Sequence, residues 1–386
     1  MVHSTIGKIK WSKYWVNVCN FLHLSSIMFS IIDRYIIKKY LSTFVFTMAI
    51  FTVVMVIFDI SERLDDFLKY NAPMDKIIFE YYAGFIPFYL NFLCPLINFI
   101  AVIFFTSKMA DQTEIVPILS AGYSFNRLLR PYAFSATLIF AVSFIFNLYI
   151  IPRTNKIKIG FENIYVKPLK DNTKVSTHMQ IDKNSYVYID NFDNNAQVGY
   201  KFVLEKFKGD TLLEKLIAER ITWDSVTTKW KIHDYSNRII NGLHERMDKG
   251  TVKDTTLDMK PSDFELYDNI FTAMDTKELN ERIYKEEIRG TGMMTDLKLE
   301  KYKRYVYPFS AFVLTLMGVA LSSKKVRGGI GLSLGVGIGL SFTYIVFIQF
   351  ANMFSLKGGL PPLIAVLIPN VTFLIIAIYL AIRAPK

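Results

Sequence analysis

Six long apolar runs alternate with polar segments along the chain, and each run can cross a membrane as a helix. About 20 apolar residues span the hydrocarbon core, because an α-helix rises about 1.5 Å per residue. Pro87 and Pro95 interrupt the second run, and membrane helices tolerate prolines where neighbouring helices satisfy the freed backbone groups. The predicted spans are 36–58, 78–106, 130–151, 305–322, 328–350 and 360–382.

Between the third and fourth spans the pattern changes to short runs in which apolar and polar residues alternate. SYVYIDNF at 185–192 and GYKFVLEKF at 199–207 are examples, and Asn, Asp and Gly residues punctuate them. Alternation at period two with frequent turn signals predicts an antiparallel sandwich or roll over 156–268. We expect Trp223 and Trp230 to pack in or near its core.

Residues 269–300 return to a helical pattern, which predicts a connector from the β-domain to the fourth span. Asp275 or Thr276 can cap a helix that has Glu278 in its first turn. The predicted fold is an α-helical membrane protein with six transmembrane helices, three on each side of an inserted all-β domain. Its parts are an N-terminal extension (1–31), spans 1–3 (32–155) with a polar segment at 108–130, the β-domain (156–268), the connector (269–300) and spans 4–6 (301–386).

The N-terminal extension, YWVNVCNFLHLSSIMFSII at 14–32, is only mildly apolar. A signal peptide would need a cleaner apolar core and a cleavage site of small residues. Two interpretations remain open: an interfacial amphipathic helix, or a start assigned too early, with Met28 the true initiator.

The formal net charge of +11 is explained by the membrane. No basic stripe with interleaved aromatic residues is present, so the sequence gives no reason to expect nucleic acid as a partner. Basic clusters fall on one side if both termini are cytoplasmic, which places the β-domain outside the cytoplasm. These clusters are Arg34, Lys38 and Lys39; Lys108, Arg127 and Arg130; Lys324, Lys325 and Arg327; and Arg383 and Lys386.

The sequence carries few signs of catalysis. There is no Walker A loop, no H-E-x-x-H and no G-x-S-x-G motif. Two distant cysteines make no disulfide framework, and the histidines at 178, 233 and 244 lack metal-ligand spacing. No carboxylate sits in the middle of a span, where a proton relay would need one. We therefore expect no enzyme, no metal and no cofactor, and an ion-driven carrier is disfavoured.

Gly331, Gly335 and Gly339 recur every four residues and form one small-residue face on the fifth span. Such a face lets another helix approach closely in lipid. The partner is either a separate subunit or another helix of this chain.

The polar segment ADQTEIVPILSAGYSFNRLLRP at 110–131 is patterned as short helices. Pro117 makes a first helix kinked or short, Gly122 ends it, and a second helix can begin at Ser124 or Asn126. Two interpretations follow. The segment either inserts into a groove on a separate soluble subunit, with Glu114 pairing with a basic residue there, or it is an interfacial loop whose charges are solvated.

Four local motifs resemble the lipopolysaccharide-export permeases of the LptF/LptG (YjgP/YjgQ) family. IDRYIIKKYL at 32–41 resembles the family's opening into span 1, and TEIVPILSAGYSFNRLLRP at 113–131 resembles its coupling segment. IPRTN at 151–155 resembles the exit from span 3, and GGLPPLIAVLIPN at 358–370 resembles the signature of span 6. The resemblance covers 32–386, so the unmatched leader favours Met28 as the start. The GGLPP form is closer to LptG than to LptF.

The resemblance implies a transport subunit of an ABC-type exporter. It would pair with a sister permease on a dimeric, LptB-like cytoplasmic ATPase. Its spans 1 and 5 would line a cavity that takes lipopolysaccharide from the inner membrane. The jellyroll-like β-domain would pass the lipid to LptC/LptA-like bridge proteins in the periplasm. Glu114 falls on the family's acidic coupling position, with Thr113, Ile115 and Gly122 beside it.

Lipid phosphates need cations, and four basic residues lie at the exterior ends of spans 1 and 3: Arg63, Arg153, Lys156 and Lys158. Ordinary interfacial anchoring is the alternative role for them. Some family members carry a basic residue where this chain has Asp59, and Arg63, one turn on, can substitute. The rival functions are an ion-gradient-driven carrier and a membrane-anchored assembly scaffold with a β recognition domain.

Overall fold

The computed structural model describes residues 30–166, 173–193, 196–264, 270–290, 292–323 and 329–384. Apart from its last two residues, the predicted N-terminal extension lies outside these ranges, and so does the basic cluster at 324–327.

In this described part of the chain, six helices are long and apolar enough to cross a membrane, three before and three after a β-sheet, as predicted. Several are built from consecutive helical segments. Span 1 is α2 (Ile31–Lys69); span 2 is α3 (Met74–Lys76), η1 (Ile77–Tyr81) and α4 (Tyr82–Asp111); span 3 is α6 (Phe125–Ile145), η2 (Phe146–Ile150) and α7 (Ile151–Tyr165). Span 4 is α10 (Met294–Val306), η4 (Tyr307–Phe309) and α11 (Ser310–Ser322); spans 5 and 6 are α12 (Gly329–Gly358) and α13 (Pro362–Ile382).

Helix α2 extends well past the predicted span 36–58 at both ends. Ser30 caps it, with a reciprocal capping box to Asp33, and it runs for 39 residues, about 58 Å at 1.5 Å per residue. That exceeds a hydrocarbon core of about 30 Å, so part of the helix lies beyond the membrane. Asp59, the residue directly after the predicted span, does not end the helix, because α2 continues for another ten residues and Asp59 is buried.

Helix α4 is the centre of the bundle, since α2, α7, α11 and α12 all pack against it. Its Asn98 is fully buried and joins two other spans. The Tyr40 hydroxyl donates to Asn98 Oδ1 at 2.6 Å, and Asn98 Nδ2 donates to Thr315 Oγ1 at 3.1 Å. Buried polar groups need such partners, so this chain of bonds fixes spans 1, 2 and 4 to one another.

The insert is an antiparallel six-stranded sheet in the order β1-β2-β3-β4-β5-β6, which confirms the inserted all-β domain. The described strands form one meandering sheet, not two packed sheets, so the sandwich alternative does not hold. The segment after β6 supplies the second layer, because Phe264 stacks on Phe192 and the indole of Trp230 donates to the carbonyl of Met259 at 2.9 Å. The strands are β1 (Thr173–Asp182), β2 (Ser185–Asp193), β3 (Val198–Lys208), β4 (Thr211–Asp224), β5 (Lys229–Asn241) and β6 (His244–Thr255).

Short helices connect the sheet to span 4: η3 (Pro261–Asp263), α8 (Ile270–Ala273) and α9 (Thr276–Arg289). The predicted cap is present, since Asp275 and Glu278 form a capping box. The carboxylate of Asp263 forms ion pairs with Arg282 and Arg289 of α9, all three being largely buried. This cluster ties the end of the sheet to the connector.

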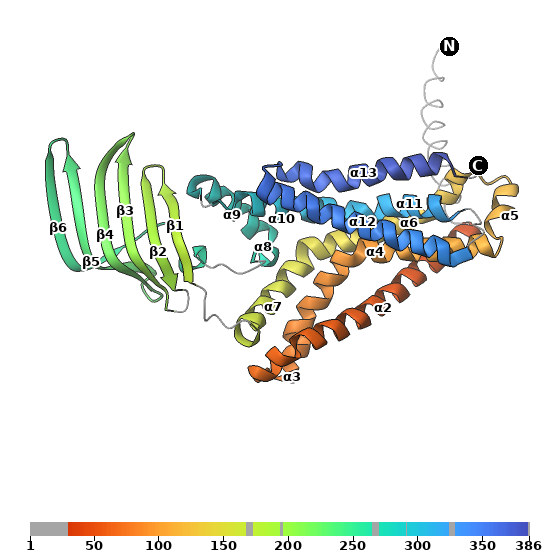
Figure 1. Cartoon of the computed structure of the whole chain (residues 1–386), viewed down its shortest axis with the longest axis horizontal. Coiled ribbons are helices and arrows are strands. Elements are labelled where there is room, and N and C mark those ends of the chain that lie inside the picture. Colours follow the sequence, from red (N-terminus) through yellow and green to blue (C-terminus); the bar gives the residue numbers. More distant parts are fainter. Residues whose placement is uncertain are drawn as a thin grey trace, which may run out of the picture.

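Figure 1 shows the sheet at one end of the helical bundle and helix α5 (Ile115–Ser120) at the other. The predicted β-domain and the predicted coupling segment therefore lie on opposite sides of the bundle.

Candidate functional site

The polar segment between spans 2 and 3 forms a compact turn around α5. Thr113 has a positive φ of 58° and Gly122 one of 88°, so the chain reverses direction on both sides of the helix. Ile115 is 2% exposed and packs into the bundle core, whereas its neighbour Val116 is 61% exposed. As predicted, the helix around Pro117 is short, and a second helix, α6, is capped by Ser124. The segment is thus anchored in the bundle by Ile115, while Val116 points outward from it.

Glu114 is the N-cap residue directly before α5 and contacts the start of α2. The Tyr35 hydroxyl donates to Glu114 Oε2 at 3.1 Å. A second link lies beside it, where Arg127 Nη2 is 2.8 Å from Asp33 Oδ2. The hydrogen bond from Tyr35 orients the partly exposed carboxylate of Glu114 at the end of the bundle where α5 lies (Figure 1).

The opposite end of the bundle carries a network of charged and aromatic side chains between α2, η1 and α7. Asp59 Oδ1 accepts from the Tyr81 hydroxyl at 2.8 Å and from Arg63 Nε at 3.2 Å. Arg63 also lies 3.7 Å from Glu162, which pairs with Lys158 at 3.5 Å. Acids and bases alternate here, so much of the positive charge is neutralised within the chain.

The four predicted lipid contacts therefore fall into two pairs. The side chains of Arg63 and Lys158 are 23% and 12% exposed and belong to the network, with the Lys158 ammonium within 6 Å of four aromatic ring centroids. Arg153 and Lys156 are exposed, although Lys156 lies 3.3 Å from Glu278 of the connector. Only the second pair offers cations directly to the surroundings.

Helix α12 has two small-residue faces, one occupied and one open. A Cβ atom built on Gly337 would overlap the Ile103 side chain of α4, so this glycine serves packing within the chain. Around Gly331, Gly335 and Gly339, a Cβ atom would meet no described atom within 4 Å. The predicted glycine face is thus the open one, free for a partner.

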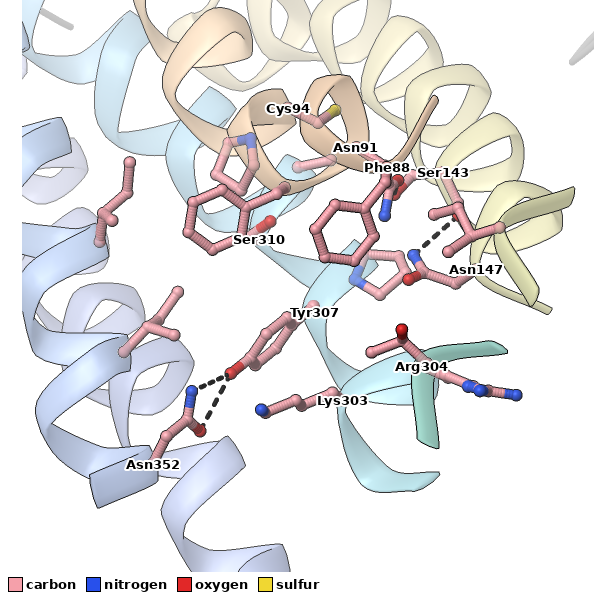
Figure 2. A pocket seen from close by; sticks show the side chains of 18 of the residues that line it. Phe88, Asn91, Cys94, Ser143, Asn147, Lys303, Arg304, Tyr307, Ser310 and Asn352 are labelled. Carbon is pink, nitrogen blue, oxygen red and sulfur yellow. Dashed lines mark hydrogen bonds between the residues drawn. The ribbon is translucent and has the colours of Figure 1, made fainter. Parts of the chain in front are cut away.

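A cavity of about 280 Å³ lies inside the bundle between α4, span 3, span 4 and α12, and sequence reasoning missed it. Figure 2 shows Tyr307 in hydrogen-bond contact with Asn352, and Lys303 beside them. The Ser143 hydroxyl donates to Asn91 at 2.7 Å on another wall. Asparagines inside apolar runs were the signal that could have found it, because a polar side chain in a span usually faces the protein interior.

Among the residues that the structure describes, no group of three His, Cys, Asp or Glu side chains could hold a metal ion. His178 and His244 are exposed strand residues, and His233 bonds to Thr222 at 2.9 Å.

Two comparisons with known proteins bear on the chain. A family model described as lipopolysaccharide export system permease LptF/LptG matches residues 34–383. A search of curated proteins finds no match.

Proposed function

The chain belongs to the LptF/LptG family of lipopolysaccharide export permeases, and from that premise we propose that it is the permease subunit of an ABC-type exporter driven by a separate ATPase. The protein would extract lipopolysaccharide from the inner membrane together with a sister permease. ATP hydrolysis would take place on the partner chain, an LptB-like dimer at the cytoplasmic end.

The observation that carries the proposal is the turn around α5, from Thr113 to Gly122, at the end of the bundle opposite the sheet. Glu114 is oriented by Tyr35, and the exposed Val116 lies beside it. An oriented carboxylate next to an exposed apolar side chain suits docking into a groove with a basic residue. We propose Glu114 as the coupling residue, with Thr113, Ile115 and Gly122 fixing the shape of the turn.

The helices proposed to line the lipid cavity are the least covered by their own chain. Of the most apolar stretch of α2, 6% is buried, compared with 61% in α10–α11. The open glycine face of α12 adds a second uncovered surface. Surfaces of this kind support pairing with a sister subunit around a shared cavity.

We propose that the sheet end lies in the periplasm and hands the lipid to LptC/LptA-like bridge proteins. Strand β6 is at the edge of the described sheet, and an edge strand can receive a strand from another protein. Both chain termini would then be cytoplasmic, in agreement with the basic clusters of the loops.

The exposed Arg153 and Lys156 are the better candidates for lipid phosphates, because Arg63 and Lys158 already contact Asp59 and Glu162. Photo-crosslinking to lipopolysaccharide should therefore fall more in the Arg153→Gln/Lys156→Gln double variant than in the Arg63→Gln/Lys158→Gln double variant. Equal crosslinking in the first variant and the parent would leave these residues with interfacial anchoring only.

The decisive experiment is co-purification of the tagged chain after gentle detergent extraction. A stoichiometric ATPase is expected, whereas an ion-gradient carrier or an assembly scaffold would come without one. Glu114→Lys should weaken the association by about 2–5 kcal/mol, the cost of leaving a buried partner charge unpaired, or about 30- to 5000-fold.

Two control variants locate the cause. Asp111→Lys makes the same charge change three residues earlier, on an exposed side chain, and should retain the ATPase. Tyr35→Phe removes the hydrogen bond within the chain but keeps the carboxylate, so its effect should be small, about 1 kcal/mol. Equal retention of the ATPase by Glu114→Lys and Asp111→Lys would refute the coupling role.

A further inference from the structure

The cavity inside the bundle has an unusual balance of charge for the interior of a membrane protein. Its lining includes one carboxylate, Glu300, and two cations, Lys303 and Arg304. Arg304 Nε donates to Glu300 at 3.1 Å and Arg304 Nη2 donates to the carbonyl of Phe271 at 2.9 Å. Within the described residues, Lys303 has no carboxylate within salt-bridge distance. The lining therefore carries one positive charge in excess.

The polar side chains around this charge are able to receive an anion. Arg304 is 2% exposed, and its guanidinium, which Figure 2 shows directed away from the Lys303 ammonium, is held by Glu300 and the carbonyl of Phe271. Figure 2 shows the Lys303 side chain directed toward the pair formed by Tyr307 and Asn352. Leaving the Lys303 ammonium without a partner in a low-dielectric interior is costly. An anion in the cavity would remove that cost.

The size and the opening of the cavity indicate what kind of anion fits. Ligand pockets for whole small molecules measure about 300–1,000 Å³, so a cavity of about 280 Å³ suits a headgroup rather than an entire lipid. Phe92 of α4 and Gln349 of α12 line the cavity and are also exposed on the bundle surface. A ligand can therefore place its polar head inside while its acyl chains remain in the membrane.

The depth of the cavity agrees with such an amphiphile. Gln349 lies eight residues before Lys357, near the end of α12 on the side of the sheet. Eight residues correspond to about 12 Å along the helix. The opening is thus in the leaflet nearer the β-domain, below the level of the helix ends.

We propose that this cavity binds the phosphodiester headgroup of an anionic phospholipid, with Lys303 as the cation that holds the phosphate and the pair formed by Tyr307 and Asn352 beside it. A single negative charge matches the excess charge of the lining, and a lysine ammonium forms charge-assisted hydrogen bonds to phosphate. The site lies within one chain, unlike the transport cavity proposed between two permeases, and it requires only that the six helices span a membrane. It would anchor a lipid that is retained, not exported.

The test is photo-crosslinking of the purified full-length chain, with any subunits that accompany it, in lipid nanodiscs. The probe is a phosphatidylglycerol with a diazirine near the acyl carbonyl, and the readout is the labelling of peptides that contain Phe92 or Gln349. Lys303→Gln should reduce labelling about tenfold, the effect of losing one charge-assisted hydrogen bond. Lys301→Gln is the matched control, because Lys301 lies on the same helix but does not line the cavity.

Three further measurements keep the proposal falsifiable. Gln349→Trp narrows the opening at an exposed position and should reduce labelling even if Lys303→Gln fails to fold. Unlabelled phosphatidylglycerol should compete, whereas phosphatidylcholine should not, because its choline cation would face Lys303. Competition by millimolar inorganic phosphate would assign the same site to a free phosphate. Equal labelling of the parent, Lys303→Gln and Gln349→Trp would overturn the proposal.

Discussion

The two small-residue faces of α12 allow one helix to test folding and pairing separately. Gly335→Leu places a side chain on the open face, where no described atom lies within 4 Å. Gly337→Leu places the same side chain where even a Cβ atom would overlap Ile103. The two positions are two residues apart on one helix and therefore lie on different faces of it, so each variant is the control for the other.

The magnitudes follow from this geometry. Both substitutions gain up to about 1 kcal/mol of helix propensity over glycine, and this gain cancels in the comparison. Overpacking a filled interior costs about 1–3 kcal/mol, so Gly337→Leu should be less stable than Gly335→Leu by that amount. On the open face, the leucine side chain would be overpacked only when a partner helix lies against α12, so its cost would fall on the paired state. Gly335→Leu should therefore weaken pairing with the sister permease about 5- to 150-fold.

Two assays are needed. Unfolding in mixed micelles measures the stability of each variant, and the fraction of sister permease retained on dilution measures pairing. We expect Gly337→Leu to lower the stability measured in the first assay, and Gly335→Leu to lower the pairing measured in the second. Parent-like pairing by Gly335→Leu would show that the open face is not a pairing surface. Equal stability of the two variants would contradict the assignment of the faces themselves.

Three other predictions address orientation, acid stability and the sheet core. In intact cells, a membrane-impermeant thiol reagent should label Ser225→Cys in the β4–β5 turn but not Gln112→Cys beside α5; the reverse pattern would invert the topology. Burial alone would raise the pKa of Asp263, but the hydrogen bond from Arg289 and the charge of a second arginine outweigh it and lower the pKa. The stability contributed by this ionised carboxylate is complete above the unfolded pKa of about 3.9 and is lost as pH falls through the lower native pKa. Asp263→Asn should therefore be less stable than the parent at neutral pH and should lose less stability on acidification. An acid titration followed by tryptophan fluorescence measures both. Trp230→Ala should cost about 3–5 kcal/mol because the indole is fully buried, while a parent-like unfolding midpoint would show that the sheet core lies elsewhere.

The architecture could be predicted because each element has its own local signal. Apolar runs of membrane length gave the six helices, and alternation gave the strands. The exact ends of the helices could not be predicted as well. The charged residues of 59–69 mark the end of the apolar run but not the end of the helix, because α2 continues through them to Lys69. A single sheet was hard to distinguish from a sandwich, because the layer that covers it is an irregular segment around Met259 and Phe264.

The candidate site was predictable in part. Glu114 followed from its motif, and Pro117 and Gly122 indicated a short helix. The partner Tyr35 could not be found, because it is 79 residues away in sequence and meets Glu114 only when α2 packs beside the turn. The same applies to Lys303, whose place in a cavity depends on four spans arriving at one point.

The middle of α2 has a consequence for how this protein can change over evolutionary time. From Val45 to Phe58, within the described helix, no side chain is buried, while both ends of the helix are pinned by buried residues. These 14 positions extend about 21 Å, and folding of the chain constrains mainly Met48, Phe51 and Met55, which pack partly buried against the bundle. At the other positions of this stretch, any restriction on substitution beyond apolarity must come from outside the chain. The pattern of accepted replacements along this stretch would thus record the shape of whatever touches it, and a new partner or a new glycolipid could be accommodated there without rebuilding the fold.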